Sequence, residues 1–142
     1  MIEICFVCTG NTCRSVMAER IAKKMAKNKK IKDIKFSSAG IYAKGDNITE
    51  NAASALKHFG YDGRNRKSVL LKKVKPNVIY VAVTNDHKRF ISSKKCLSFE
   101  ELAGGVSDPY GQNVEVYLQT AKQIEKNVEV LLEKLKALRG EL

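Results

Sequence analysis

The chain has 142 residues, which is the length of one compact domain. Hydrophobic residues make up 44% of it and charged residues 29%, a balance that excludes an intrinsically disordered chain. The net charge of +11 favours anionic partners, and no apolar run approaches the length of a membrane span. The apolar start is short and interrupted by Glu3, unlike a signal peptide, so we expect a cytoplasmic protein.

Predicted strands and helices alternate along the chain. In chain order we predict a strand at 2–7, a helix at 15–29, a strand at 34–38, a helix at 47–58, a strand at 77–83, a short helix at 86–92, a strand at 95–99 and a long helix at 113–139. The first and third strands are continuous apolar runs, as in strands buried on both faces. The helix over 47–58 begins with Asn47-Ile-Thr-Glu50, which resembles a capping box. The last helix has apolar residues at alternating spacings of three and four, an amphipathic pattern.

This alternation predicts an α/β fold in one domain over residues 1–142, with a parallel sheet and helices on both faces. In such folds, ligands bind beyond the carboxyl ends of the strands. The segment that follows the first predicted strand is Cys8–Arg14, with the sequence Cys-Thr-Gly-Asn-Thr-Cys-Arg. We therefore expect the functional site in this segment.

The segment from Cys8 to Ser15 has the features of a receptor for a phosphate dianion. The backbone N–H groups of residues 9–14 can converge on one point as the chain curls into the next helix, whose N-terminus adds partial positive charge. Gly10 permits a tight backbone geometry, and Arg14 supplies a planar fork for two phosphate oxygens. The same field favours the thiolate form of Cys8, and Ser15 could donate a hydrogen bond to its sulfur. Cys8 is then the predicted nucleophile for attack on phosphorus, with a phosphocysteine intermediate.

Other interpretations of the loop and of its partner groups are plainer. The loop lacks the Gly-Lys-Ser/Thr sequence of nucleotide-binding P-loops, so it does not indicate a site for a magnesium nucleotide. An ordinary strand–helix turn with a buried cysteine would also fit. Hydrolysis needs a general acid, and Asp108 is the candidate because it precedes Pro109 on a loop before the last helix. A plain turn would explain the same two residues.

The remaining cysteines and histidines do not predict a metal site. Cys5 and Cys8 have a zinc-like spacing, but positions three apart on a strand point to opposite faces, and the sequence has no second pair. His58 and His87 are interpreted as surface or packing residues. No metal ion or other cofactor is therefore expected.

Basic residues are concentrated in two regions, and the plainer interpretation of both is a solvated surface. The first spans residues 23–35. The second consists of Arg64, Arg66, Lys67, Lys72, Lys73 and Lys75. No aromatic-rich nucleic-acid motif accompanies the charge, so we expect acidic phosphoproteins rather than nucleic acids or membranes as partners. The sequence leaves the oligomeric state open, with a monomer expected.

These motifs resemble those of the low-molecular-weight protein tyrosine phosphatase family over nearly the whole chain. The matching segments are Val7–Ser15, Met17–Glu19, Ser38–Gly40 and Asp108–Tyr110. The resemblance implies a four-stranded parallel sheet flanked by helices. It also implies that Cys8 is the nucleophile, Arg14 the phosphate clamp, and Asp108 the general acid and then the general base.

The resemblance assigns roles to the rest of the loop as well. It implies that Asn11 holds the strained loop through side-chain hydrogen bonds and that Ser15 stabilises the thiolate. Cys13 matches a second loop cysteine of the family, which can form a reversible disulfide with Cys8 and protect it from over-oxidation. The predicted substrate-binding set is Thr9, Gly10, Asn11, Thr12, Cys13, Ser15 and Tyr110.

Two positions resemble the bacterial protein-arginine phosphatase branch of this family. Members that act on phosphotyrosine typically carry a bulky apolar residue at the position of Thr12 and two aromatic residues after the Asp-Pro pair. Here Thr12 leaves room beside a planar guanidinium, and Gly111 follows a single Tyr110. Val16 and Gln112 depart from the family pattern without removing a catalytic group.

We therefore expect a metal-free phosphoprotein phosphatase that hydrolyses phosphoarginine, with phosphotyrosine as the alternative substrate. A second hypothesis is an arsenate reductase, which also uses a Cys-x5-Arg loop but needs a relay of further cysteines, and only Cys96 follows the loop here. A third is a non-catalytic phosphoanion-binding module with nucleic-acid affinity. It gives no reason for Cys8, Arg14 and Asp108 to occur together.

Overall fold

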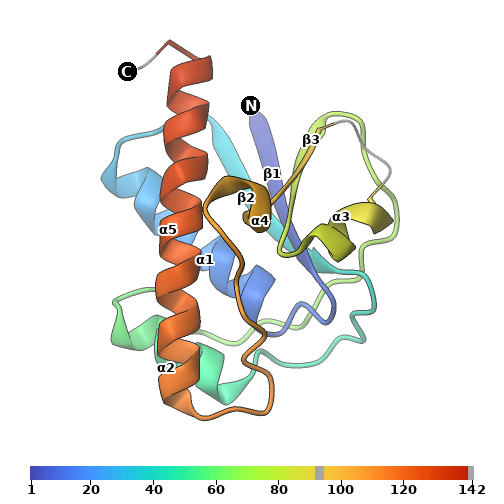
Figure 1. Cartoon of the computed structure of the whole chain (residues 1–142), viewed down its shortest axis with the longest axis vertical. Coiled ribbons are helices and arrows are strands. Elements are labelled where there is room, and N and C mark those ends of the chain that lie inside the picture. Colours follow the sequence, from blue (N-terminus) through green and yellow to red (C-terminus); the bar gives the residue numbers. More distant parts are fainter. Residues whose placement is uncertain (92–94, 141–142) are drawn as a thin grey trace.

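The structure is a computed structural model, and it describes residues 1–91 and 95–140. Within this part of the chain, four parallel strands form one sheet in the order β2-β1-β3-β4. The strands are β1 (Ile2–Cys8), β2 (Ile34–Gly40), β3 (Val78–Ala82) and β4 (Cys96–Ser98). The helices are α1 (Arg14–Asn28), α2 (Glu50–His58), α3 (Asn85–Phe90), α4 (Phe99–Leu102) and α5 (Val114–Leu138). The expected four-stranded parallel α/β fold is confirmed (Figure 1).

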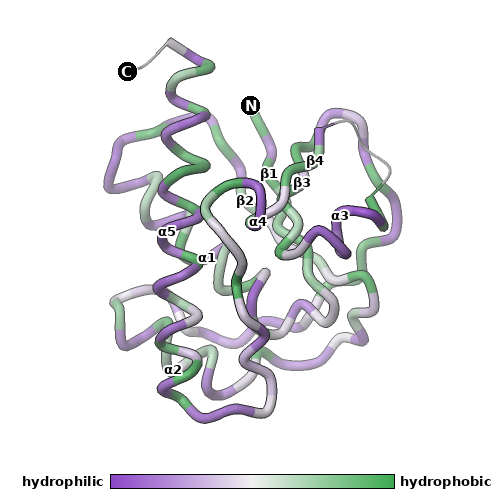
Figure 2. The backbone as a smooth tube through the Cα atoms, viewed as in Figure 1, coloured by the Kyte–Doolittle hydropathy of each residue, from purple (hydrophilic) through white to green (hydrophobic). Residues whose placement is uncertain are grey.

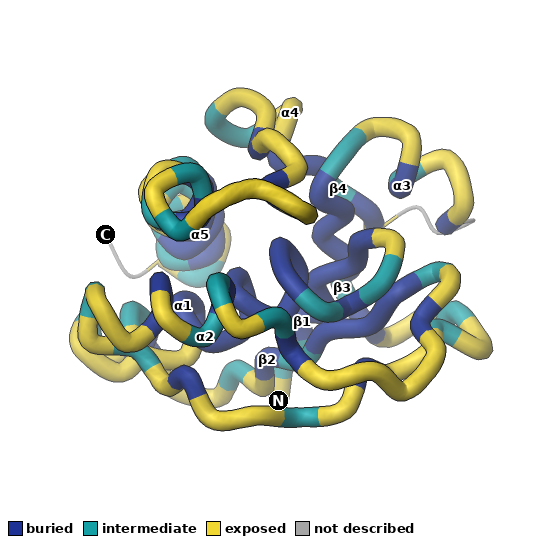
Figure 3. Tube along the Cα trace, turned by 90° about the horizontal axis from the view of Figure 1, so that it is seen from below, coloured by how far each residue is buried: buried dark blue, intermediate teal, exposed yellow. Residues whose placement is uncertain are grey.

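Helices and loops cover the two faces of the sheet unequally. β1 points Phe6 and Cys8 into the larger apolar core, which α1, α2 and α5 complete. Its alternate residues, Cys5 and Val7, point into a smaller cluster that includes Ile91, just after α3. Figure 3 shows the strands buried and much of the connecting loops exposed. Cys5 and Cys8 therefore lie on opposite faces of the sheet, as predicted from their spacing.

The apolar stripe predicted for the last helix is the side of α5 that packs against α1 and α2. Its buried residues include Tyr117, Ile124, Leu131 and Leu135. Figure 2 shows hydrophobic and hydrophilic residues alternating along this helix. Leu138, at the predicted end of the stripe, is 85% exposed, because this end of α5 extends past the rest of the molecule (Figure 1).

The start of α2 differs from the prediction. The N-cap is Thr49, whose Oγ1 accepts a hydrogen bond from the N–H of Ala52 at 3.3 Å. Asn47, the predicted cap, instead accepts hydrogen bonds through Oδ1 from Asn65 Nδ2 and Lys67 Nζ. Both Asn and Thr are good N-caps, so composition alone did not distinguish the two positions.

Two short helices flank β4. α4 was not predicted, because four residues are too few for a periodic pattern. Its start is a capping box formed by Ser98 and Glu101. α3 begins one residue earlier than predicted, and residue 92, the predicted end of this helix, lies outside the described residues.

The chain leaves the centre of the sheet at Cys8. β1 lies between β2 and β3, and Cys8 pairs in register with Gly40 at the end of β2. The loop after β1 therefore emerges at the carboxyl edge of the sheet, where α/β folds bind ligands, and runs straight into α1. Among the helices that the structure describes, none is long and apolar enough to cross a membrane.

Candidate active site

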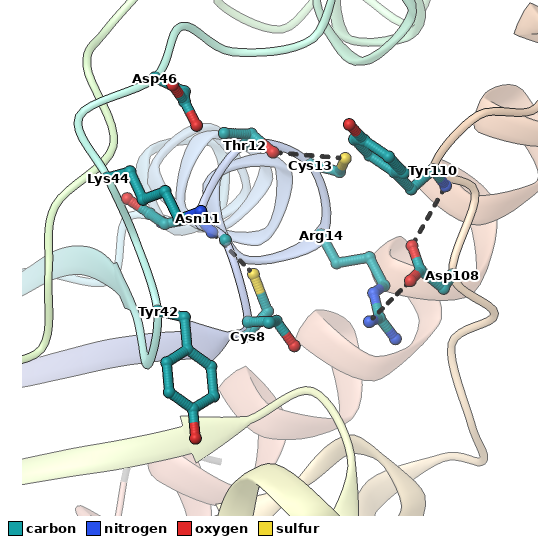
Figure 4. A pocket seen from close by; sticks show the side chains of 12 residues that line it. Cys8, Asn11, Thr12, Cys13, Arg14, Tyr42, Lys44, Asp46, Asp108 and Tyr110 are labelled. Carbon is teal, nitrogen blue, oxygen red and sulfur yellow. Dashed lines mark hydrogen bonds and ion pairs between the residues drawn. The ribbon is translucent and has the colours of Figure 1, made fainter.

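A pocket of about 330 Å³ opens at the loop that joins β1 to α1 (Figure 4). Its lining residues are Cys8, Thr9, Gly10, Asn11, Thr12, Cys13, Arg14, Tyr42, Lys44, Asp46, Asp108 and Tyr110. All of the predicted site residues except Ser15 are in this set. Tyr42, Lys44 and Asp46 were not predicted, because they lie on the loop after β2, where no local motif marks them.

The sulfur of Cys8 is held by two hydrogen-bonding groups. Ser15 Oγ lies 2.9 Å from Cys8 Sγ, and the backbone N–H of Asn11 donates to the same sulfur at 3.3 Å. Cys8 is buried, so these groups take the place of water around the sulfur. Such donors stabilise a thiolate more than a thiol, because an anion accepts the stronger hydrogen bonds.

The unusual backbone conformation in the loop belongs to Asn11 rather than to Gly10. Asn11 has a φ of 56°, in the left-handed region, whereas the φ of Gly10 lies outside this region. Within 4 Å, a Cβ at Gly10 would meet only Thr12 Oγ1, at 3.6 Å. The prediction that Gly10 permits the tight geometry is therefore wrong. Asn supplies it, because Asn tolerates the left-handed region better than most non-glycine residues.

Four hydrogen bonds hold the buried side chain of Asn11. Its Nδ2 donates to Ser15 Oγ at 2.8 Å and to Ser38 Oγ at 3.0 Å. Its Oδ1 accepts from Arg66 Nη2 at 3.1 Å and from the backbone N–H of Val69 at 2.9 Å. These bonds tie the loop to α1, to β2 and to the segment that follows α2.

Ser38 and Arg66, which bond the Asn11 side chain, are themselves linked to the carboxylate of Glu19. Ser38 Oγ donates to Glu19 Oε1 at 2.6 Å and accepts from Arg66 Nη2 at 2.8 Å. Arg66 Nη1 lies 3.5 Å from the same carboxylate oxygen of Glu19. Arg66 was interpreted as part of a solvated basic surface, but only 27% of its side chain is exposed. A run of basic residues does not reveal which member turns inward, so the sequence did not single out Arg66.

Gly40 lets the backbone of the loop approach β2 closely. A Cβ at this position would lie 2.6 Å from the carbonyl oxygen of Thr9 and 2.9 Å from the nitrogen of Asn11. A hydrogen bond stabilises this close packing of the two backbone segments: the N–H of Tyr42 donates to the same Thr9 oxygen at 2.9 Å. The matched segment Ser38–Gly40 thus has a physical reason: Ser38 bonds the Asn11 amide, and Gly40 makes room for the loop.

Arg14 and Asp108 meet at the mouth of the pocket. Arg14 Nη2 lies 3.6 Å from Asp108 Oδ2, and Arg14 Nη1 donates to the carbonyl oxygen of Val106 at 3.1 Å. Figure 4 shows the two charged side chains pointing toward each other, with Tyr110 beside them. The N–H of Tyr110 donates to Asp108 Oδ1 at 3.1 Å. The Asp108 side chain is 60% exposed, so the loop before α5 presents a carboxyl group to an incoming ligand.

Cys13 lies on the side of the loop that faces α2 and α5. Its Sγ is 3.6 Å from Tyr117 Oη and accepts a hydrogen bond from Thr49 Oγ1 at 3.8 Å. Burial, together with the contact to Cys13, raises the pKa of Tyr117 to about 12, so the phenol is a neutral hydrogen-bonding group. The predicted disulfide between Cys8 and Cys13 stays a prediction, since both thiols are free in the structure.

The two histidines differ in their surroundings. His58 is a surface and packing residue as expected, and its ring lies edge-on to Phe59 with centroids 4.9 Å apart. His87 is buried, and its Nε2 lies 2.8 Å from Thr9 Oγ1 in the loop. The interpretation of His87 as a surface or packing residue therefore missed a polar contact with the site. No local signal could reveal this contact, because 78 positions separate the two residues.

Cys5 and Cys96 lie in the apolar cluster on the opposite face of the sheet from Cys8. Burial raises the pKa of Cys5 to about 11, and burial also raises the pKa of Cys96. Neither Cys5 nor Cys96 is therefore placed to act as the second thiol of the cysteine relay that an arsenate reductase would need after Cys8. Over residues 1–91 and 95–140, no three side chains of His, Cys, Asp or Glu are grouped as metal ligands would be.

A cysteine that accepts hydrogen bonds inside an anion-binding loop at a helix N-terminus is the arrangement of phosphatases that form phosphocysteine. Fold and pocket together therefore define a cysteine-dependent phosphatase. The family model that matches residues 3–140 is described as low molecular weight phosphotyrosine protein phosphatase. The chain belongs to this family, as its motifs predicted.

Its relatives are named for two substrates. The chain is 34% identical to a protein-arginine-phosphatase of Geobacillus stearothermophilus, over 94% of this chain and 95% of that protein. The structure of a cysteine-to-serine mutant of the YwlE arginine phosphatase, with a phosphorylated active-site serine, has a TM-score of 0.87 at 31% identity and covers 95% of this chain and 96% of that chain. The structure of a low molecular weight protein tyrosine phosphatase from T. tengcongensis has a TM-score of 0.85 at 34% identity and covers 94% of this chain and 99% of that chain.

Proposed function

We propose that this protein is a protein-arginine phosphatase, which removes phosphoryl groups from phosphoarginine through a phosphocysteine intermediate at Cys8 and without a metal ion. The observation that carries the chemistry is the pair of hydrogen-bonding groups at the Cys8 sulfur, Ser15 Oγ and the N–H of Asn11. The YwlE mutant supports a covalent route, because in that protein an active-site serine carries the phosphoryl group.

In the first step, the Cys8 thiolate attacks phosphorus, the S–P bond forms, and the P–N bond to the substrate arginine breaks. The N–H groups of the loop and the guanidinium of Arg14 stabilise the negative charge on the phosphoryl oxygens. Asp108 in its acid form gives a proton to the departing guanidine nitrogen. The 3.6 Å between Asp108 Oδ2 and Arg14 Nη2 supports this role, because it sets the acid beside the phosphate clamp.

In the second step, Asp108 acts as the base. Its carboxylate takes a proton from a water molecule, whose oxygen attacks the phosphorus of phosphocysteine. The S–P bond then breaks, which releases inorganic phosphate and regenerates the thiolate of Cys8. The hydrogen bond from Ser15 makes the sulfur a better leaving group, since it stabilises the negative charge that returns to it.

The lining of the pocket supports arginine as the substrate side chain. Thr12 is short, so it leaves room beside a branched guanidinium, and its hydroxyl can form hydrogen bonds. Asp46 offers a carboxylate on the wall next to Thr12 (Figure 4), which would attract the N–H groups of a guanidinium. Lys44 lies on the same wall, so the pocket has both charges rather than a purely cationic lining. Tyr110, followed by Gly111, covers one side only.

The test compares hydrolysis of matched peptides that carry phosphoarginine or phosphotyrosine, in buffer with a chelator. We expect kcat/KM to favour phosphoarginine by at least about tenfold, the order that one pocket contact can supply. Activity that survives the chelator would support the metal-free route, and activity lost with the chelator and restored by a metal ion would contradict it.

Two variants of Thr12 separate the contribution of space from that of the hydroxyl. Thr12→Ile adds bulk and removes the hydroxyl, whereas Thr12→Val removes the hydroxyl at nearly constant volume. We expect Thr12→Ile to shift the preference toward phosphotyrosine and Thr12→Val to shift it less. A clear tyrosine preference in the unaltered protein, unchanged by Thr12→Ile, would refute arginine specificity and leave a tyrosine phosphatase of the same family.

The aromatic residues at the pocket favour phosphotyrosine as the second candidate substrate. Tyr110 and Tyr42 line the pocket from two different loops and could pack against a phenyl ring. Arsenate reduction has less support, because Cys96 lies in the apolar cluster on the opposite face of the sheet from Cys8.

We further propose that the protein acts as a monomer in the cytoplasm on phosphorylated proteins, without nucleic acid or membrane. Its four free cysteines suit a reducing compartment.

A further inference from the structure

The residue that follows the catalytic cysteine is held from two sides. The carbonyl oxygen of Thr9 accepts a hydrogen bond from the N–H of Tyr42 at 2.9 Å, close against Gly40. On the other side, Thr9 Oγ1 lies 2.8 Å from His87 Nε2. Thr9 is the first residue of the loop whose N–H groups form the proposed phosphate receptor, so its position affects the whole receptor.

The ring of His87 is itself fixed at both nitrogens. His87 Nδ1 lies 2.9 Å from Thr84 Oγ1, and Thr84 is the N-cap of α3 that also accepts the N–H of His87 at 3.1 Å. The side chain is buried, so water does not compete for these bonds. Thr84, His87 and Thr9 therefore form a hydrogen-bonded chain that runs from the start of α3 to the phosphate loop.

The charges that face His87 come from four parts of the molecule. Arg14 on α1 disfavours a proton on the ring, whereas Asp86 on α3, Asp108 before α5 and Glu100 on α4 favour it. Burial is the largest influence, and with Arg14 it lowers the pKa of His87 below the ordinary value. Arg14 is also the phosphate clamp of the proposed mechanism, so an anion that binds in the loop would offset the charge that opposes protonation.

We propose that His87 is a positioning residue for the phosphate loop, acting through Thr9, and that it couples the binding of a tetrahedral dianion in the loop to the uptake of a proton by its ring. This inference rests on the proposed function of the loop as a phosphate site. A bound dianion stabilises the imidazolium, and by reciprocal linkage a protonated His87 strengthens binding of the dianion. The uncharged ring still holds Thr9, since neutral imidazole keeps one donor and one acceptor.

A double-mutant cycle tests the positioning role. His87→Ala and Thr9→Val each remove one end of the same hydrogen bond, and we expect each to lower kcat/KM about tenfold. The double variant should also lose about tenfold rather than about a hundredfold, because the bond can be lost only once. His87→Gln should recover most of the activity, since its amide offers a donor and an acceptor. Independent losses that multiply to about a hundredfold would overturn the positioning role.

The proton coupling is measured on the unaltered protein by NMR. The chain has two histidines, so His58 is an internal control for His87. The probe is inorganic sulfate, a tetrahedral dianion that does not titrate in this range. We expect saturating sulfate to raise the midpoint of the His87 ring signals and to leave that of His58 unchanged. Equal behaviour of the two histidines, or no shift at His87, would overturn the coupling.

The reciprocal measurement uses the affinity for sulfate. Acidification should tighten sulfate binding several-fold more in the unaltered protein than in His87→Gln, which cannot take up the proton. An identical pH dependence in both would refute the inference. Binding and NMR do not require turnover, so failure of the proposed phosphatase activity would appear separately, as an absence of hydrolysis by the unaltered protein.

Discussion

Replacing Gly40 by alanine tests whether the phosphate loop depends on the close approach of two backbone segments. Gly40 ends β2, and a Cβ there would lie 2.6 Å from the Thr9 carbonyl oxygen and 2.9 Å from both the Asn11 nitrogen and the Gly10 carbonyl carbon. All of these are backbone atoms, so no side-chain rotation can relieve the contact. The loop itself must move.

The size of that movement follows from the distances. Ordinary van der Waals contact begins at 3.4 Å, so the carbonyl of Thr9 must retreat by about 0.8 Å. Such a shift disturbs the N–H of Asn11, which donates to the Cys8 sulfur at 3.3 Å. Misplacing reactive groups by about 1 Å can cost about 100-fold in rate, whereas overpacking costs about 1–3 kcal/mol of stability. We therefore expect Gly40→Ala to remain folded and to lose about 100-fold in kcat/KM.

The assay combines hydrolysis of an aryl phosphate with urea unfolding. Gly10→Ala is the matched control for stability, because its Cβ would meet only Thr12 Oγ1, at 3.6 Å. Its free energy of unfolding should stay within about 0.5 kcal/mol of the unaltered protein. If Gly40→Ala kept its activity to within about threefold while losing no stability, the close approach of Gly40 would not set the geometry of the loop.

Three further predictions concern other parts of the site. Asn11→Ala removes four side-chain hydrogen bonds, so the free energy of unfolding in urea should fall by about 3 kcal/mol or more, and a loss under about 1 kcal/mol would contradict the network. Asp108→Asn cannot donate a proton to the leaving group, so kcat/KM should fall about 100-fold or more for a poor leaving group and much less for p-nitrophenol; equal losses in kcat/KM would argue against the acid role. Burial lowers the pKa of His87 from 6.5, so below about pH 6.5 the unfolded chain takes up a proton before the folded protein does. Stability should therefore fall with acidification, less so in His87→Gln, and parallel urea unfolding curves at pH 5 and 7.5 check this.

Local patterns in the sequence were enough for the order of the elements apart from α4, and for the loop at which the pocket opens. The first and third strands, the long helix and the loop of residues 8–15 each have a signal within their own segment: an apolar run, a helical stripe, or a cysteine and arginine between a strand and a helix. Errors arose where two residues offered the same local chemistry. Asn47 and Thr49 can both cap a helix, and Gly10 and Asn11 can both adopt unusual backbone angles, and in each case packing decided.

The cysteine-containing loop between a parallel strand and a helix was predictable from the sequence, because every part of that motif lies within a few residues. The contacts that hold the loop in place were not predictable from the sequence. Ser38, Arg66 and His87 contact it across 27, 55 and 78 positions of the chain. Contacts at such separations leave no periodic or local trace, since they exist only once the sheet and helices have packed.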